Sequence, residues 1–218
     1  MSKWVAGFVL MLYSVVVSLA IPLFVRASLK VEDRELRRRR LILAKHLVFL
    51  LWLIIPSAAL MATSYSHILL IGSPLVLPWA GLVWLLNVCI HAVFEVMQLR
   101  SRGVRVRKKS IGMRGLLLEL RDQLYYIGLP EEMLFRGIMV GVAMSLIGIH
   151  GAIMLSSTLF GLGHLIHERR IARFIETFLT STIYSIGLIF AGSVWAPAIA
   201  HILVNLFFAS VSLEPAHS

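Results

Sequence analysis

Charged residues are scarce in this chain. Asp, Glu, Lys and Arg make up 15% of its 218 residues, hydrophobic residues make up 59%, and the mean hydropathy is +0.87. An ordinary soluble domain has about 25% charged and roughly 45–50% apolar residues. The composition therefore argues against an ordinary soluble domain and indicates a protein of the lipid bilayer. The length is enough for one hydrophobic domain.

Cysteine and acidic residues are also few. The single cysteine, Cys89, excludes an intramolecular disulfide and leaves the redox compartment undetermined. Only 11 Asp and Glu stand against 21 Lys and Arg, which gives a net charge of +10. A basic nucleic-acid-binding face needs a soluble domain to carry it, and the sequence has none. We therefore expect the basic residues to lie against anionic lipid headgroups of the bilayer and not against nucleic acid.

Long apolar stretches fill most of the sequence. A bilayer core of about 30 Å needs roughly 20 apolar residues in a helix. The sequence predicts an all-α, polytopic membrane bundle of about seven segments, without internal repeats or low-complexity tracts. The fourth segment is interrupted at Gly128-Leu129-Pro130. The expected segments are Trp4–Val25, Leu41–Ala62, Pro74–Met97, Leu116–Gly148, Ile149–Ile166, Phe174–Ala191 and Val194–Ser212.

Basic residues alternate between successive connections. Seven of them fall in Arg26–Arg40, seven in Arg100–Arg114 and three in Arg169–Arg173, and the connections between these blocks contain no Lys or Arg. The positive-inside rule then predicts an N-terminus outside and three basic loops in the cytoplasm. The lack of eukaryotic sorting signals is compatible with a prokaryotic plasma membrane.

Ionisable groups inside a membrane are costly, so they form a functional-site hypothesis. The first cluster begins at Pro130, which marks a helix start. Glu132 and Arg136 are four residues apart and can pair on one helical face. Glu131 points about 100° away from Glu132 and is left for other work. The alternative is a capped helix end with carboxylates at the membrane interface.

Two further clusters follow along the chain. Phe160 and His164 share a helical face, and two glycines between them allow close packing against a neighbouring helix. His201 and Asn205 are also four residues apart in an apolar segment. Each cluster alone is equally compatible with interhelical hydrogen bonding. Together with the glutamates they supply a carboxylate base, imidazoles and a carboxamide donor, which can activate water and stabilise an oxyanion.

The motifs Glu-Glu-x-x-x-Arg, Phe-x-x-x-His and His-x-x-x-Asn, in this order, resemble the CPBP family. This family comprises CAAX proteases and bacteriocin-processing enzymes, is also called Abi, and includes the type II CAAX prenyl endopeptidases. The resemblance covers about residues 116–210. It implies a catalytic core at 116–212 after N-terminal helices and basic loops at 1–115, with a tail at 213–218. It also implies a polar cavity inside the helical bundle, in which a peptide bond is hydrolysed.

The resemblance also implies roles for the motif residues. Glu131 would be the general base that deprotonates water, His164 would help to hold that water, and His201 with Asn205 would form the oxyanion site. Glu132, Arg136 and Phe160 would support them. Many family members have Asn three residues after the second-motif histidine. This chain has His167 there, which we expect to face the cytoplasmic loop.

Other polar residues of the membrane segments are expected to be structural. Asn87, His91 and Glu95 form a stripe at four-residue spacing, which either lines the same cavity or pairs with Lys45 or His46. Glu176 is expected to pair with a neighbouring arginine, Arg173 or Arg170.

A metal is the main mechanistic rival. Two carboxylates and two histidines can bind zinc, and a zinc-bound hydroxide would perform the same hydrolysis. The sequence has no His-Glu-x-x-His motif, and Asn205 and Arg136 suit an oxyanion site and an ion pair better than a ligand set. We therefore expect a glutamate-type protease without a cofactor.

The expected substrate is a membrane-associated peptide or protein, such as a prenylated C-terminus or a leader peptide. Two other classes of function stay open: a non-catalytic immunity or scaffold protein of the same fold, and a small transporter. The sequence leaves the oligomeric state undetermined.

Overall fold

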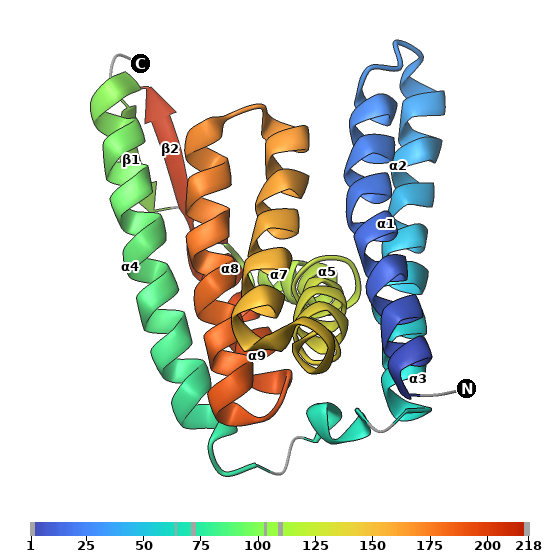
Figure 1. Cartoon of the computed structure of the whole chain (residues 1–218). Helices are drawn as coiled ribbons and strands as arrows, with labels where there is room; N and C mark the ends of the chain where they lie inside the picture. The colour runs from blue at the N-terminus through green and yellow to red at the C-terminus, as the bar shows by residue number, and fades with distance from the viewer. Residues whose placement is uncertain (1–2, 64, 71–72, 103, 109–110, 216–218) are drawn as a thin grey trace.

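The computed structural model describes residues 3–63, 65–70, 73–102, 104–108 and 111–215 (Figure 1). The longest helices are α1 (Lys3–Leu29), α4 (Val76–Arg102), α7 (Met144–Glu168) and α8 (Ile171–Ala191). Helix α2 (Arg34–Val48) continues through a π-helical stretch η1 (Phe49–Ile54) into α3 (Ile55–Met61). The shorter elements are η2 (Ser66–Leu69), α5 (Met113–Tyr125), α6 (Gly128–Glu132), η3 (Met133–Val140), α9 (Trp195–Ala209), β1 (Val104–Lys108) and β2 (Val211–Pro215).

The expected helical membrane bundle is confirmed. Five stretches of the described chain are long and apolar enough to cross a bilayer, namely Trp4–Leu29, Arg34–Met61, Val76–Met97, Met144–Glu168 and Ile171–Ala191. Helix α9 is apolar but shorter. Large apolar side chains such as Phe8, Leu77 and Phe190 are exposed on the outside of these helices. In a bilayer such side chains face lipid, so the chain is an integral membrane protein.

The fourth expected segment, Leu116–Gly148, is divided into α5, α6 and η3. Pro130 lies in the first turn of α6, where its missing N–H breaks no helical hydrogen bond. All eight residues of η3 are buried. The N–H of Gly141 bonds to the carbonyl of Arg136 at 2.9 Å, an i→i+5 bond that widens the turn. Gly148, inside α7, has a φ of +75° and breaks the helical path where the sequence predicts a turn.

A small two-stranded ribbon joins the far ends of α4 and α9. Strands β1 and β2 pair antiparallel, with Val104 opposite Pro215 and Lys108 opposite Val211. The sequence predicts a loop at β1, and at β2 it predicts the end of the Val194–Ser212 segment followed by a tail, so the ribbon is an addition to the predicted all-α fold. The alternation Val-Arg-Val-Arg in β1 is the period-two pattern typical of a strand.

Helices α1 and α2 stand on one side of the molecule and α4 on the other, with α7, α8 and α9 between them (Figure 1). Helix α7 packs closely because of its two motif glycines. A Cβ on Gly161 would lie 2.9 Å from the Phe174 ring and 3.2 Å from its carbonyl oxygen, so only glycine allows α8 this near. Gly163 faces Pro22 and Ser18 of α1. The second motif is therefore fixed between α1 and α8.

The three basic connections lie at one end of the molecule. The α1–α2 turn, the end of α4 and the α7–α8 turn are on the same side in Figure 1, and the N-terminus is at the opposite end. This arrangement agrees with the alternation of charge along the sequence. That this end faces the cytoplasm stays a prediction from the positive-inside rule.

Candidate active site

The first and third motifs meet in a buried ion-pair cluster. Glu132 and Arg136 are completely buried, and Arg136 Nε lies 3.2 Å from Glu132 Oε2. The other carboxylate oxygen of Glu132 is 2.7 Å from His201 Nδ1. An ionised carboxylate only accepts hydrogen bonds, so His201 must carry its proton on Nδ1 to donate this one. Glu132 therefore compensates the charge of Arg136 and orients the ring of His201.

Aromatic rings enclose the guanidinium of Arg136. Its Cζ lies 4.9 Å from the ring centre of Phe160 and 5.1 Å from that of Tyr184, within the range of cation–π attraction. Its Nη2 also donates to the carbonyl of Ser181 at 3.2 Å. The ring of Tyr184 stacks on that of His201 with a 4.9 Å separation of centroids. Phe160, the first residue of the second motif, thus contacts the ion-pair cluster through the guanidinium of Arg136.

Glu131 lies beside this cluster but is engaged differently. Its side chain is 15% exposed, whereas that of Glu132 is fully buried. Its Oε2 is 3.7 Å from His201 Nε2, which is longer than a direct hydrogen bond. The sequence predicts that Glu131 and Glu132 have different partners, because side chains 100° apart on a helix face different neighbours.

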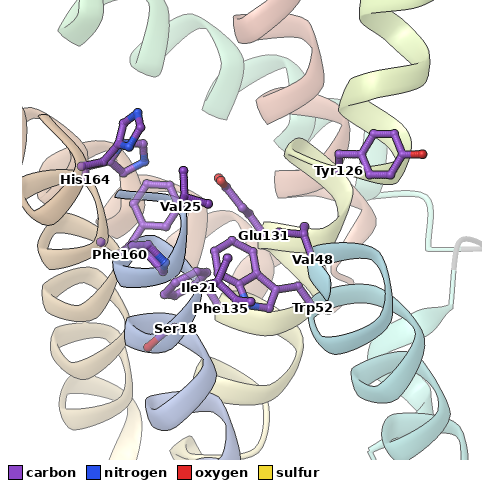
Figure 2. A pocket seen from close by; sticks show the side chains of 13 residues that line it. Ser18, Ile21, Val25, Val48, Trp52, Tyr126, Glu131, Phe135, Phe160 and His164 are labelled. Carbon is purple, nitrogen blue, oxygen red and sulfur yellow. The ribbon is translucent and has the colours of Figure 1, made fainter. Parts of the chain in front are cut away.

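Glu131, Phe160 and His164 line two neighbouring cavities. The first, here called the apolar chamber, has a volume of about 200 Å³. Figure 2 shows the Glu131 carboxylate pointing into it, with Phe160 and His164 on the α7 side. The rest of its lining comes from α1, α2, η1 and neighbouring segments and is mainly hydrocarbon, comprising Ser18, Ile21, Pro22, Val25, Val48, Trp52, Tyr126, Phe135, Gly163 and His167.

The second cavity, here called the polar chamber, has a volume of about 360 Å³. It shares Glu131, Phe160 and His164 with the apolar chamber. Its remaining lining comprises His91, Glu119, Gln123, Ile127, Arg173, Thr177, Thr180, Tyr184, His201, Asn205, Phe208 and Ala209. All four expected catalytic residues, Glu131, His164, His201 and Asn205, therefore face one cavity, although they lie on three different elements.

A chain of ionisable groups extends from His164 to His91, which both line the polar chamber. His164 Nδ1 is 3.8 Å from Glu168 Oε1, and this oxygen accepts a 3.0 Å hydrogen bond from Arg173 Nε. Arg173 Nη1 is 2.9 Å from Glu176 Oε1, which also bonds to Nδ1 of His91. Arg173 is thus held by two carboxylates. The chain ties α7, α8 and α4 together around the chamber.

Asn205 also has a partner that the motifs did not indicate. Its Nδ2 donates to Gln123 Oε1 at 2.8 Å, and Gln123 Nε2 donates to Glu119 Oε1 at 2.9 Å. Gln123 is only 2% exposed. Glu119 and Gln123 both lie on α5, the helix before the first motif, and they share one helical face because they are four residues apart. That spacing is the signal by which the sequence could have indicated them.

Of the two alternatives left open for the stripe on α4, pairing with Lys45 or His46 is not the one that His91 adopts. Lys45 Nζ bonds to Asp122 at 2.9 Å, and His46 Nδ1 lies 2.8 Å from the carbonyl of Ile42 in its own helix. Segments 77 residues apart in the chain bring Lys45 to α5, which the spacing along α4 could not reveal.

Other expectations hold. The pairing of Glu176 with Arg173 is confirmed. His91 lines the cavity, one of the two roles expected of its stripe, and Asn87 is buried and donates to the carbonyl of Val83. His167 is exposed, as expected of a residue facing a loop, but it lies in the last turn of α7 and borders the apolar chamber.

A bound metal ion needs several donor side chains that converge on one point. Within the described part of the chain, no three His, Cys, Asp or Glu side chains converge as a ligand set. The carboxylates of the first motif are instead engaged with Arg136 and His201. The requirement for a metal stays open to experiment.

Comparison with protein families gives one match over the C-terminal region. Residues 114–207 match the family model described as type II CAAX prenyl endopeptidase, Rce1-like. Comparison with curated proteins and with solved structures gave no match. The matched region begins in α5, ends in α9 and contains all three motifs of the buried site. Over residues 114–207 the chain is therefore similar to the Rce1-like type II CAAX prenyl endopeptidases, in agreement with the resemblance that the motifs indicated.

Proposed function

We propose that the chain is a glutamate-type intramembrane endopeptidase that hydrolyses a peptide bond close to a hydrocarbon-modified residue of its substrate. One observation carries this proposal. Glu131 and His164 lie where an apolar chamber meets a polar chamber. A lipid-modified peptide has the same two parts, so its hydrocarbon chain and its peptide chain can occupy one chamber each and bring the bond between them to Glu131.

The proposed reaction is direct attack by water. Glu131 accepts a proton as the water oxygen bonds to the substrate carbonyl carbon. The tetrahedral intermediate then collapses, the carbon–nitrogen bond breaks, and the proton held by Glu131 passes to the leaving amine. The products are a carboxylic acid, which then releases its proton to solvent, and an amine, and no covalent enzyme intermediate forms. His164, across the chamber, would hold the attacking water.

The developing oxyanion would be stabilised by His201 and Asn205. His201 can donate through Nε2 only when its ring carries protons on both nitrogens, because Nδ1 already donates to Glu132. The Glu132 carboxylate lies 2.7 Å from Nδ1 and the Glu131 carboxylate lies 3.7 Å from Nε2, so both ring nitrogens face an acceptor. The second N–H of the Asn205 amide is the other donor.

The cytoplasmic side is the proposed side of substrate entry. His164 lies one turn before the end of α7, close to the end of the molecule that carries the basic connections. Those connections would lie against anionic headgroups, where each Lys or Arg contributes about 1 kcal/mol to binding of the membrane surface.

A pair of substrates tests the assignment of the apolar chamber. One fluorogenic peptide carries a prenyl thioether next to the scissile bond, and its partner carries free cysteine at the same position. The proposal predicts faster cleavage of the prenylated peptide by the purified protein in lipid nanodiscs. In Val48→Trp the larger ring should fill the chamber and raise KM for the prenylated peptide about tenfold or more.

The matched control is Val93→Trp, which places the same ring on the exposed outer face of α4. It should cleave both peptides as the wild type does. Equal cleavage of both peptides by the wild type, or an unchanged KM in Val48→Trp, would contradict the role proposed for the apolar chamber.

A further inference from the structure

Helix α5 places a short hydrogen-bond relay behind the third motif. The relay runs from Asn205 Nδ2 to Gln123 Oε1 at 2.8 Å, and from Gln123 Nε2 to Glu119 Oε1 at 2.9 Å. All three residues line the polar chamber. We propose that Glu119 and Gln123 are positioning residues that fix the orientation of the Asn205 amide. This inference rests on the proposed role of Asn205 as a donor to the oxyanion.

The direction of the relay follows from the chemistry of its last member. An ionised carboxylate accepts hydrogen bonds and donates none. Glu119 therefore selects the amide nitrogen of Gln123, which leaves the amide oxygen of Gln123 facing Asn205. Asn205 must then present its amide nitrogen to Gln123. One N–H of Asn205 is used in this bond, and the other is held in a defined direction.

Packing keeps Gln123 in this position. Its side chain is 2% exposed. A Cβ on Gly128 would lie 3.1 Å from Gln123 Oε1 and 3.0 Å from Ile202 of α9, so the glycine leaves room for the oxygen. A buried amide that has lost its hydrogen-bond partner is destabilising, so an alternative rotamer of Gln123 is unfavourable. The relay is therefore a built feature of the α5–α9 contact.

The position of an oxyanion donor matters because its effect depends on geometry. Removal of one such donor lowers turnover by about 100- to 1,000-fold, and a displacement of about 1 Å can cost about 100-fold. Gln123→Leu keeps Asn205 but removes its partner. We expect kcat to fall about 10- to 100-fold with little change in KM. Glu119→Gln replaces a carboxylate, which only accepts hydrogen bonds, with an amide that can also donate. Gln123 can then adopt either amide orientation, and kcat should fall less than in Gln123→Leu.

A double-mutant cycle separates positioning from general packing. If Gln123 acts through Asn205, then Gln123→Leu should lower kcat no further, within about twofold, once Asn205 is already alanine. A purely structural role predicts that the two losses multiply. Glu35→Gln is the matched control for Glu119→Gln, because it makes the same change at an exposed glutamate paired with Arg38 and Arg39 of its own helix. It should leave kcat unchanged.

A second readout does not depend on catalysis. The chain has only two asparagines, Asn87 and Asn205, so asparagine-selective isotope labelling gives two side-chain amide signals in NMR spectra. The proposal predicts that Glu119→Gln and Gln123→Leu shift the Asn205 amide signals and leave those of Asn87 unchanged. Unmoved Asn205 signals would overturn the relay, and so would multiplicative losses in the cycle. Absence of any cleavage by the wild type would instead contradict the proposed function, with the NMR result still deciding the relay.

Discussion

The buried pair of Glu132 and Arg136 allows a prediction with a defined magnitude. Both side chains are fully buried, and their charged atoms are 3.2 Å apart. Coulomb attraction at that distance is about 5 kcal/mol with an effective dielectric constant of about 20. Removing one partner of a buried pair typically costs about 3–5 kcal/mol, because the other charge is left without compensation. Arg136→Met should therefore raise the equilibrium constant for unfolding by a few hundred- to a few thousand-fold.

The companion variants test the cause of this loss. Glu132→Gln alone leaves the cation of Arg136 uncompensated and should also be strongly destabilised. The double variant Glu132→Gln/Arg136→Met buries no charge at this place. We expect it to recover most of the loss in each single variant, so that the effects are far from additive.

Reversible unfolding in mixed detergent and lipid, followed by the fluorescence of the chain's five tryptophans, measures these free energies. A double variant whose loss equals the sum of the two single losses would refute this reasoning, since it would show that the two charges do not compensate one another. A single loss below about 1 kcal/mol for Arg136→Met would refute it as well, because the guanidinium would then be hydrated and not buried.

Two further predictions concern the packing around the site. Burial alone would raise the pKa of Asp122, but hydrogen bonds from Arg121 and Lys45 outweigh it and hold the pKa below its ordinary value of 3.8. Asp122 should therefore add stability above pH 3.8 that is lost as the pH falls through its lowered pKa, and Asp122→Asn should show a smaller loss of thermal stability on acidification than the wild type. Gly161→Ala should cost about 1–3 kcal/mol in unfolding free energy, because its Cβ would meet Phe174 at 2.9 Å. Gly163→Ala, with its nearest neighbour at 3.5 Å, is the matched control and should change stability by less than about 1 kcal/mol, and equal losses in the two variants would contradict the close packing of α7 and α8.

The sequence predicted the parts of the site that depend on local spacing. Glu132 and Arg136 pair because four residues make nearly one helical turn, and Glu131 diverges from them for the same reason. The glycines of the second motif indicated close helix packing, which Gly161 and Phe174 confirm. The order of the three motifs also indicated the family. These features could be predicted because each one belongs to a few consecutive residues.

The sequence could not predict pairs that join distant segments. Gln123 and Asn205 are 82 residues apart, His91 and Glu176 are 85 apart, and their contacts depend on how the helices pack. The π-helical form of η3 is also a consequence of packing, because Met133–Val140 has the composition of an ordinary apolar helix. A polar residue on a membrane helix indicates only that its side chain needs a hydrogen-bond or ion-pair partner. The fold decides which residue provides it.

The most direct test of the central proposal is the cleavage of the prenylated peptide by Glu131→Gln in comparison with the wild type. This change removes the base and keeps the size of the side chain, and Glu131 is outside the buried ion pair, so the thermal stability should stay close to that of the wild type. The proposed mechanism predicts that the variant loses cleavage by at least about 100-fold, and that wild-type cleavage resists EDTA. A folded Glu131→Gln variant with full activity would contradict the assignment of the base, and EDTA inhibition reversed by zinc would contradict the metal-free mechanism.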